Sequence, residues 1–170
     1  MHLPQQARRA REAALWKCPD CGRAFANRNQ SHACAPLDLQ HHFRGRDPAV
    51  LGLYRAFLEV LRGIGPVTVL AEKTRIAFQA RISFAQLAPR RHHLSGHLLL
   101  ARVARSAKFH RIDSLSPRNH VHHFRLESAQ FLDREFAALL RAAYAVGNQE
   151  HLRSVRPGSP RRTRTRVRTR

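Results

Sequence analysis

The sequence has few acidic residues and no long apolar segment. Asp and Glu total 11 of its 170 residues, against 31 Lys and Arg. So few carboxylates argue against a nuclease that holds two metal ions between acidic side chains. No apolar run approaches the length of a membrane-spanning helix, and the N-terminus lacks the apolar stretch of a secretion signal. We therefore expect a soluble, cytoplasmic protein that does not enter a membrane.

Familiar catalytic motifs are also missing from the sequence. It shows no Gly-rich loop suited to phosphate binding, no Ser-His-Asp order and no paired acidic metal motif. The sequence therefore assigns no catalytic residue, and it does not favour an enzyme.

Cysteine is scarce, but all three cysteines lie in one short segment near the N-terminus. With one histidine they form the spacing C-x2-C-x10-H-x-C, made by Cys18, Cys21, His32 and Cys34. Three thiolates and one imidazole are the four ligands of a closed tetrahedral zinc site. An odd number of cysteines without a secretion signal indicates a reducing compartment, where this pattern favours metal over a disulfide. We predict a structural Zn²⁺ bound by these four residues.

Some ligands are better supported than others. The spacing of Cys18 and Cys21 places both thiolates on one side of a tight turn, in which Gly22 supplies backbone freedom. Trp16 and Phe25 are the aromatics available to form a two-residue core beneath the metal.

The second ligand pair is less regular. His32 and Cys34 are two residues apart, which suits an irregular loop rather than a helical turn. His41 and His42 are therefore alternative candidates for the fourth position.

The rest of the chain predicts an α+β domain. Asp47 and Pro48 begin an amphipathic helix that ends before Gly63, and Ser128 begins a second helix that ends at Gly147. Between them, short β-branched or alternating runs predict five to six strands, at residues 67–70, 74–78, 82–87, 96–103, 109–115 and 121–126. Because the connections are too short for crossover helices, we expect a mainly antiparallel sheet with both helices on one face.

These elements divide the chain into five segments. They are a flexible basic lead-in at 1–14, a zinc-binding head at 15–36, a linker at 37–46, the α+β domain at 47–147 and a disordered Arg-rich tail at 148–170. The last twenty residues contain eight arginines and no acidic residue, so they cannot form a core.

The net charge of +20 favours nucleic acid or another polyanion as the partner. Alternation along residues 73–79 predicts a basic stripe across the open face of the sheet, which would bind phosphates without reading base sequence. An alternative origin of the arginine excess is the base composition of the coding sequence. The candidate nucleic-acid-binding residues are Lys73, Arg75, Arg81, Arg90, Arg91, Arg102 and Arg118.

Two other functions stay open at this point. One is a module that binds a small ligand or a protein partner and is capped by a purely structural zinc head, for which we expect an apolar pocket between sheet and helices. The other is a histidine-dependent hydrolase or nuclease, which requires His97, His120 and His122 to converge.

Several short motifs resemble a known family. They are LWKCPDCGR at 15–23, NRNQSH at 27–32, KTRIAF at 73–78, SPRNH at 116–120 and AYAVG at 143–147. Together they resemble a bacterial family known as domain of unknown function 5655, over roughly residues 15–147. The resemblance implies a zinc-ribbon-like head joined to a small α+β domain of no established activity. It also implies that His32 and Cys34, rather than His41, are metal ligands.

Overall fold

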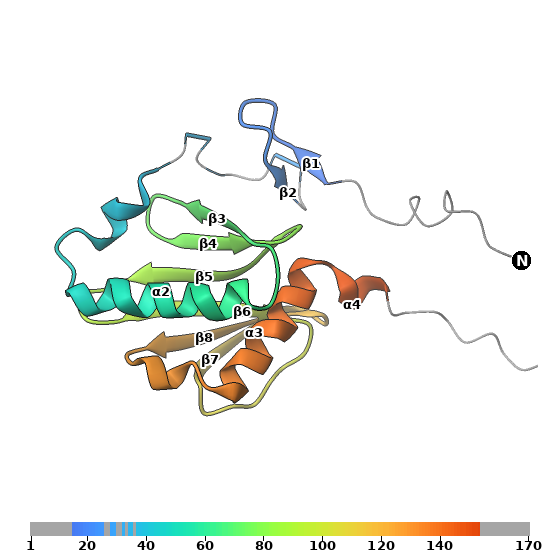
Figure 1. The fold of residues 1–170 in the computed structure, drawn as a ribbon. Coiled ribbons are helices and arrows are strands. Elements are labelled where there is room, and N and C mark those ends of the chain that lie inside the picture. The colour runs from blue at the N-terminus through green and yellow to red at the C-terminus, as the bar shows by residue number, and fades with distance from the viewer. Residues whose placement is uncertain (1–14, 26–27, 30–31, 33, 36, 154–170) are drawn as a thin grey trace, which may run out of the picture.

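A computed structural model describes residues 15–25, 28–29, 32, 34–35 and 37–153 (Figure 1). The predictions for 1–14 and 154–170 lie outside these residues. In the described part the chain forms a small two-stranded sheet followed by a six-stranded antiparallel sheet with two main helices. This confirms the predicted α+β class.

All six predicted strands of the large sheet are present. They are β3 (Thr68–Ala71), β4 (Ile76–Gln79), β5 (Ser83–Pro89), β6 (Leu94–Leu100), β7 (Phe109–Ser116) and β8 (Asn119–Leu126). Their order across the sheet is β3-β4-β5-β6-β8-β7. The chain is therefore a simple meander only as far as β6, because β8 lies between β6 and β7. The connection 101–108 carries the chain past this position to the far edge.

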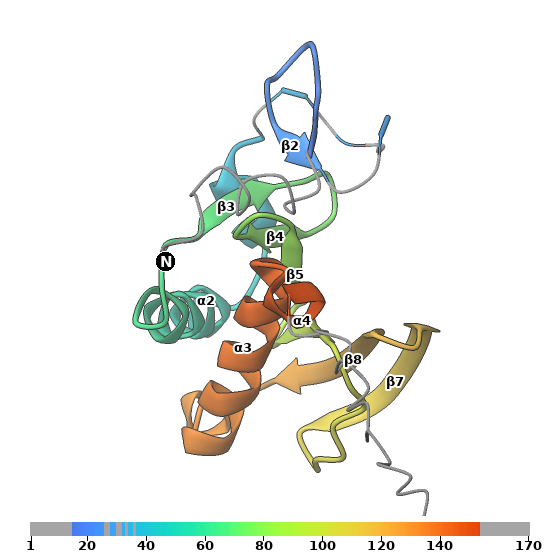
Figure 2. The ribbon, with the colours of Figure 1, turned by 90° about the vertical axis from the view of Figure 1, so that its right-hand side faces the viewer.

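Both main helices cover the same face of the sheet (Figure 2). Helix α2 spans Pro48–Arg62 and helix α3 spans Arg134–Gly147. The layer between helices and sheet is filled with aromatic rings. The ring centroids of Phe57 in α2 and Phe78 in β4 are 5.1 Å apart, and those of Phe136 in α3 and Phe124 in β8 are 5.0 Å apart. All four rings are fully buried. This packed layer holds the sheet and helices together.

The start of α2 is as predicted, whereas the prediction for the start of the second main helix is wrong. The Asp47 carboxylate accepts a hydrogen bond from the Ala49 N–H and caps α2. Ser128 makes no such bond and precedes only the short 3₁₀ helix η2 (Ala129–Phe131). Helix α3 begins later, where Asp133 accepts from the Phe136 N–H at 2.9 Å. Ser128 and Asp133 are both residues that favour the N-cap position, and it is Asp133 that caps the start of the longer helix α3.

Two further short helices belong to the described chain. The 3₁₀ helix η1 (Leu39–Phe43) lies inside the predicted linker, and Leu39 and Phe43 contact the core. Helix α4 (Glu150–Arg153) falls in the region assigned to the tail. Among the described residues, no helix has the length and apolar character needed to cross a membrane.

Candidate metal centre

The head is built on a two-stranded hairpin. Strand β1 (Trp16–Lys17) pairs with β2 (Ala24–Phe25). The turn between them is fixed by two backbone hydrogen bonds, from the Cys18 N–H to the Arg23 carbonyl and from the Gly22 N–H to the Cys18 carbonyl, each 2.9 Å. Gly22 has a φ of +70°, the left-handed conformation that favours glycine. This turn holds the first two cysteines on one side of the hairpin.

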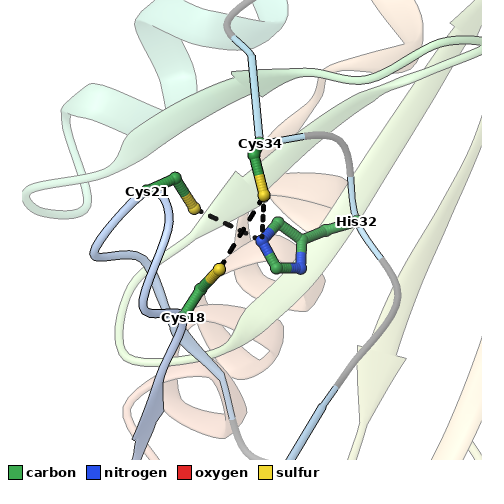
Figure 3. Close-up of side chains that lie close together, drawn as sticks. All are labelled: Cys18, Cys21, His32 and Cys34. Carbon is green, nitrogen blue, oxygen red and sulfur yellow. Dashed lines mark hydrogen bonds between the residues drawn. The ribbon is translucent and has the colours of Figure 1, made fainter.

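The four predicted ligands converge (Figure 3). Cys18 and Cys34 have their sulfurs 3.8 Å apart, while Nε2 of His32 lies 3.3 Å from the Cys21 sulfur and 3.4 Å from that of Cys34. All four ligand atoms lie within 4.8 Å of one another. A tetrahedral zinc ion with bonds of about 2.3 Å to sulfur and about 2.0–2.1 Å to nitrogen spaces its ligands about 3.8 Å (S···S) and about 3.6 Å (S···N) apart. The cluster therefore has the size of a tetrahedral metal site.

Two aromatic residues, Trp16 and Phe25, pack beside this cluster. The rings of Trp16 and Phe25 lie 5.9 Å apart, and the Phe25 ring lies 4.3 Å from the His32 imidazole. Phe25 is buried although the segment is short. The predicted two-residue core is thus present, and it also orients the imidazole ligand.

The thiols differ in how readily they ionise. A hydrogen bond from Arg23 is the main cause that lowers the pKa of the Cys21 thiol to about 6. Desolvation, followed by the Cys18 and Cys21 sulfurs, raises the pKa of Cys34 to about 11, because its sulfur faces the other ligands even though the residue is exposed. Three adjacent thiolates repel one another. A divalent cation removes this repulsion, so the donor set fits a metal ion.

The two alternative ligands are placed elsewhere. His41 and His42 lie in η1 and are not part of the cluster. His42 is buried, and its Nε2 atom has no hydrogen-bond partner among the described residues.

The head lies beside the β3 edge of the large sheet (Figure 1). Gln79 at the end of β4 donates a hydrogen bond of 2.8 Å to the Ala24 carbonyl of the head. A cavity of about 330 Å³ separates the two parts, lined by Cys21, Arg23, Cys34, Ala35, Leu37, Leu39, Val69, Leu70 and Ala71. This cavity is not the apolar pocket that a ligand-binding module would place between sheet and helices.

The predicted basic stripe across the open sheet face is wrong. Strand β4 begins only at Ile76, so Lys73 and Arg75 lie in the turn before it, and Gln79 is buried against the head. All seven candidate residues lie outside the strands. Because successive turns of an antiparallel sheet alternate between its two ends, they divide into two groups. Lys73, Arg75, Arg90 and Arg91 lie at one end, and Arg81, Arg102 and Arg118 lie at the other.

The convergence of His97, His120 and His122 that a histidine-dependent hydrolase or nuclease requires is not found among the described residues. His120 and His122 point to the helix side of the sheet and are buried there, as the alternation along β8 predicts. His123 follows His122 in β8 and therefore projects from the opposite face. His97 is directly opposite His123 in β6, so it lies on that opposite face too. Strand alternation could be read from the sequence, but the pairing of β6 with β8 could not.

His122 has a structural role. Its Nε2 accepts a hydrogen bond of 2.9 Å from the Ala104 N–H, and its Nδ1 lies 3.0 Å from the His120 carbonyl. Since a carbonyl only accepts, Nδ1 carries the proton and the ring is neutral. Burial lowers the pKa of His122, in agreement with that state. The ring anchors the connection 101–108 to the sheet.

Comparison with known families identifies the main domain. The family model described as Domain of unknown function (DUF5655) matches residues 39–147, which is more than half of the chain. The chain belongs to this family. The match begins in η1 and ends with α3, and it does not reach the head, so the resemblance of residues 15–32 stays a prediction. No curated protein and no solved structure gives a significant match to this DUF5655 protein.

Proposed function

We propose that this DUF5655 protein is an accessory protein that binds nucleic acid or a similar polyanion and carries a structural zinc ion in its head. The observation that supports polyanion binding is a group of exposed basic side chains at one end of the sheet, formed by Arg46, Lys73, Arg90 and Arg91. We call this group the basic end. None of the four makes an ion pair with a described residue.

Three segments meet at the basic end. The Asp47 N–H donates a hydrogen bond of 2.9 Å to the Arg91 carbonyl, so the start of α2 is joined to the β5–β6 turn. The β3–β4 turn, with Lys73, opens at the same end. The N-terminus of α2 adds the positive end of its helix dipole.

The nearby carboxylates already have partners. Asp38 pairs with Arg44, and Glu72 pairs with Arg75 at 2.6 Å. Asp47 accepts the capping hydrogen bond from the Ala49 N–H and contacts the His92 imidazole. None of these carboxylates forms an ion pair with the four residues of the basic end. Exposed, unpaired guanidinium and ammonium groups bind phosphates and release counterions from nucleic acid.

The zinc in this proposal has a structural role. Three thiolates and one imidazole fill a tetrahedral shell and leave no open position, which is typical of structural rather than catalytic sites. Zinc rather than a harder cation is favoured by the sulfur-rich donor set. Metal analysis of the purified chain should give one tightly bound zinc that depends on Cys18.

The polyanion proposal is tested by salt dependence. Binding of the full chain to short labelled DNA and RNA is measured by fluorescence anisotropy over a series of salt concentrations. The double variant Arg90→Ala/Arg91→Ala should bind more weakly. The slope of log K against log salt is negative, and its magnitude should decrease by about 1.8, because each phosphate that a basic side chain neutralises contributes about 0.9 to that magnitude.

A charge-matched control is available on the helices. Arg55 on α2 and Arg141 on α3 are exposed and lie near the middle of their helices. The variant Arg55→Ala/Arg141→Ala removes the same charge and should leave the slope nearly unchanged. Equal losses in both variants would show that net charge alone drives binding. Undetectable binding, or binding without salt dependence, would refute the proposal.

A further inference from the structure

The face of the sheet away from the helices carries polar side chains that neither the head nor the basic end uses. His97 of β6 is directly opposite His123 of β8, and their ring centroids are 5.6 Å apart. Gln86 of β5 is directly opposite His97 on its other side. Directly opposed residues of neighbouring strands project from the same face. These three side chains therefore form a row across three adjacent strands.

Asp113 fixes the orientation of one of these imidazoles. Its Oδ2 atom lies 2.8 Å from Nε2 of His123, and Arg111 holds the same carboxylate at 2.9 Å. Nη2 of Arg111, which only donates, also lies 3.0 Å from this Nε2 atom. The contact with the carboxylate, which only accepts, is the shorter of the two, so we assign the proton of His123 to Nε2. The other nitrogen, Nδ1, then has a free lone pair, and it makes no hydrogen bond within the described part of the chain. The hydrogen bond from His123, aided by Arg111, keeps the pKa of Asp113 low, so the carboxylate stays ionised.

The neighbouring groups are also suited to act as electron-pair donors. The His97 ring lies 5.6 Å from that of His123, between centroids, and a neutral imidazole is the form that ligates metals. The Oε1 atom of Gln86 is buried and has no hydrogen-bond partner among the described residues. A buried acceptor without a partner is costly unless a ligand or water satisfies it.

We propose that His97 and His123 bind a divalent transition-metal ion on the open face of the sheet, separate from the cysteine cluster of the head. Two imidazoles bound at about 2.0–2.1 Å to one tetrahedral ion have ring centroids about 5 Å apart. The observed 5.6 Å requires only a small adjustment of the side chains. A carboxylate that accepts the second ring N–H of a histidine ligand, as Asp113 does here, is the usual outer support of such a ligand.

The site differs in kind from the zinc centre of the head. It supplies two nitrogen ligands and no sulfur, so the remaining coordination positions are left to water or to a ligand. Gln86 is placed to accept a hydrogen bond from such a water, which would satisfy its Oε1 atom. Open positions are typical of sites at which a metal activates water or binds an anionic group.

Zinc stoichiometry of the full chain, with any affinity tag removed, tests this site. Equilibrium dialysis against buffered Zn²⁺ should give two zinc ions per wild-type chain, one for His97→Ala and one for His123→Ala. Asp113→Asn should keep the second ion but bind it about 10- to 100-fold more weakly. The control is His92→Ala, which removes an exposed imidazole from the β5–β6 turn and should leave two ions.

A second measurement does not depend on the variants folding. Zn²⁺ added to the wild-type chain beyond the first equivalent should shift the ring ¹⁵N resonances of His97 and His123 and leave those of His92 in place. One zinc per wild-type chain, or an unchanged second ion in both His97→Ala and His123→Ala, would overturn the proposal. Shifts that appear equally at His92 would show only adventitious surface binding and would also overturn it.

Discussion

Gly96 and Phe124 face each other across β6 and β8, and a Cβ built on Gly96 would lie 2.3 Å from Cζ of Phe124. The same Cβ would lie 2.8 Å from a methyl carbon of Leu87. Phe124 cannot move aside easily, because it is fully buried between Phe131 and Phe136. Only a residue without a side chain fits at this point in the sheet.

Gly96→Ala should therefore destabilise the domain by about 1–3 kcal/mol through overpacking. The measurement is the free energy of unfolding from a denaturant titration. Gly52→Ala is the matched control, because a Cβ there meets nothing within 4 Å and the residue lies within α2. That change should stabilise the protein by about 0.5–1 kcal/mol through helix propensity. Equal effects of the two substitutions would contradict the close packing at Gly96.

The start of α3 gives a second prediction. Asp133 caps the helix through the Phe136 N–H and also pairs with Lys108 at 2.5 Å, whereas Ser128 makes no capping bond. Asp133→Ala should lower the melting temperature by several degrees, and Ser128→Ala should leave it almost unchanged. Thermal unfolding followed by circular dichroism distinguishes them. A larger effect at Ser128 would indicate that Ser128, as expected from the sequence, caps the helix instead of Asp133.

Local signals in the sequence were reliable where one residue dominates its neighbourhood. Asp47 and Pro48 set the start of α2 as predicted, and the spacing of the cysteines identified the cluster around His32. The start of α3 was wrong because Ser128 and Asp133 are both good caps, and tertiary contacts decide between them. Here the Lys108 side chain favours Asp133.

Properties that depend on strand order could not be predicted. The sequence shows alternation along each strand but not that β8 separates β6 from β7. For this reason the pairing of His97 with His123, and the position of Asp113 beside them, had no sequence signal. The expected basic stripe failed for a similar reason, since the head contacts β4 through Gln79 and buries positions that alternation alone leaves exposed.

The head should depend on its metal while the main domain does not. Cys18 is buried and is one of the four proposed head ligands, so Cys18→Ser should lose the zinc of the head, and the hairpin should lose its ordered amide resonances. The main domain should lose only the hydrogen bond between Gln79 and Ala24, worth about 0.5–1.5 kcal/mol. His41→Ala is the control and should retain the metal. A zinc stoichiometry unchanged from the wild type in Cys18→Ser, or reduced by one ion in His41→Ala, would require a different ligand set for the head.

Acid should destabilise the fold through the buried His42. Burial lowers the pKa of this imidazole, so the folded protein holds it neutral while the unfolded chain protonates it near pH 6.5. Below that pH the unfolded state binds more protons, and stability falls as the pH decreases. A hydrogen bond to the Glu72 backbone acts against this lowering of the pKa, and the smaller effects of the nearby His41 and Arg46 act with it.

Replacing His42 with leucine removes this proton uptake. Between pH 7.5 and pH 5.5 the wild type should therefore lose stability relative to His42→Leu, by less than about 1.4 kcal/mol, the value of one pKa unit. His41→Leu, at the exposed neighbouring position, should keep most of the wild-type pH dependence, because burial rather than His41 is the main cause of the low pKa of His42. Urea unfolding at both pH values measures the difference between each variant and the wild type. All three proteins share the same cysteine cluster, so an effect of acid on the proposed head metal is common to them and cancels in this comparison. A wild-type pH dependence in His42→Leu would show that His42 titrates normally in the folded protein.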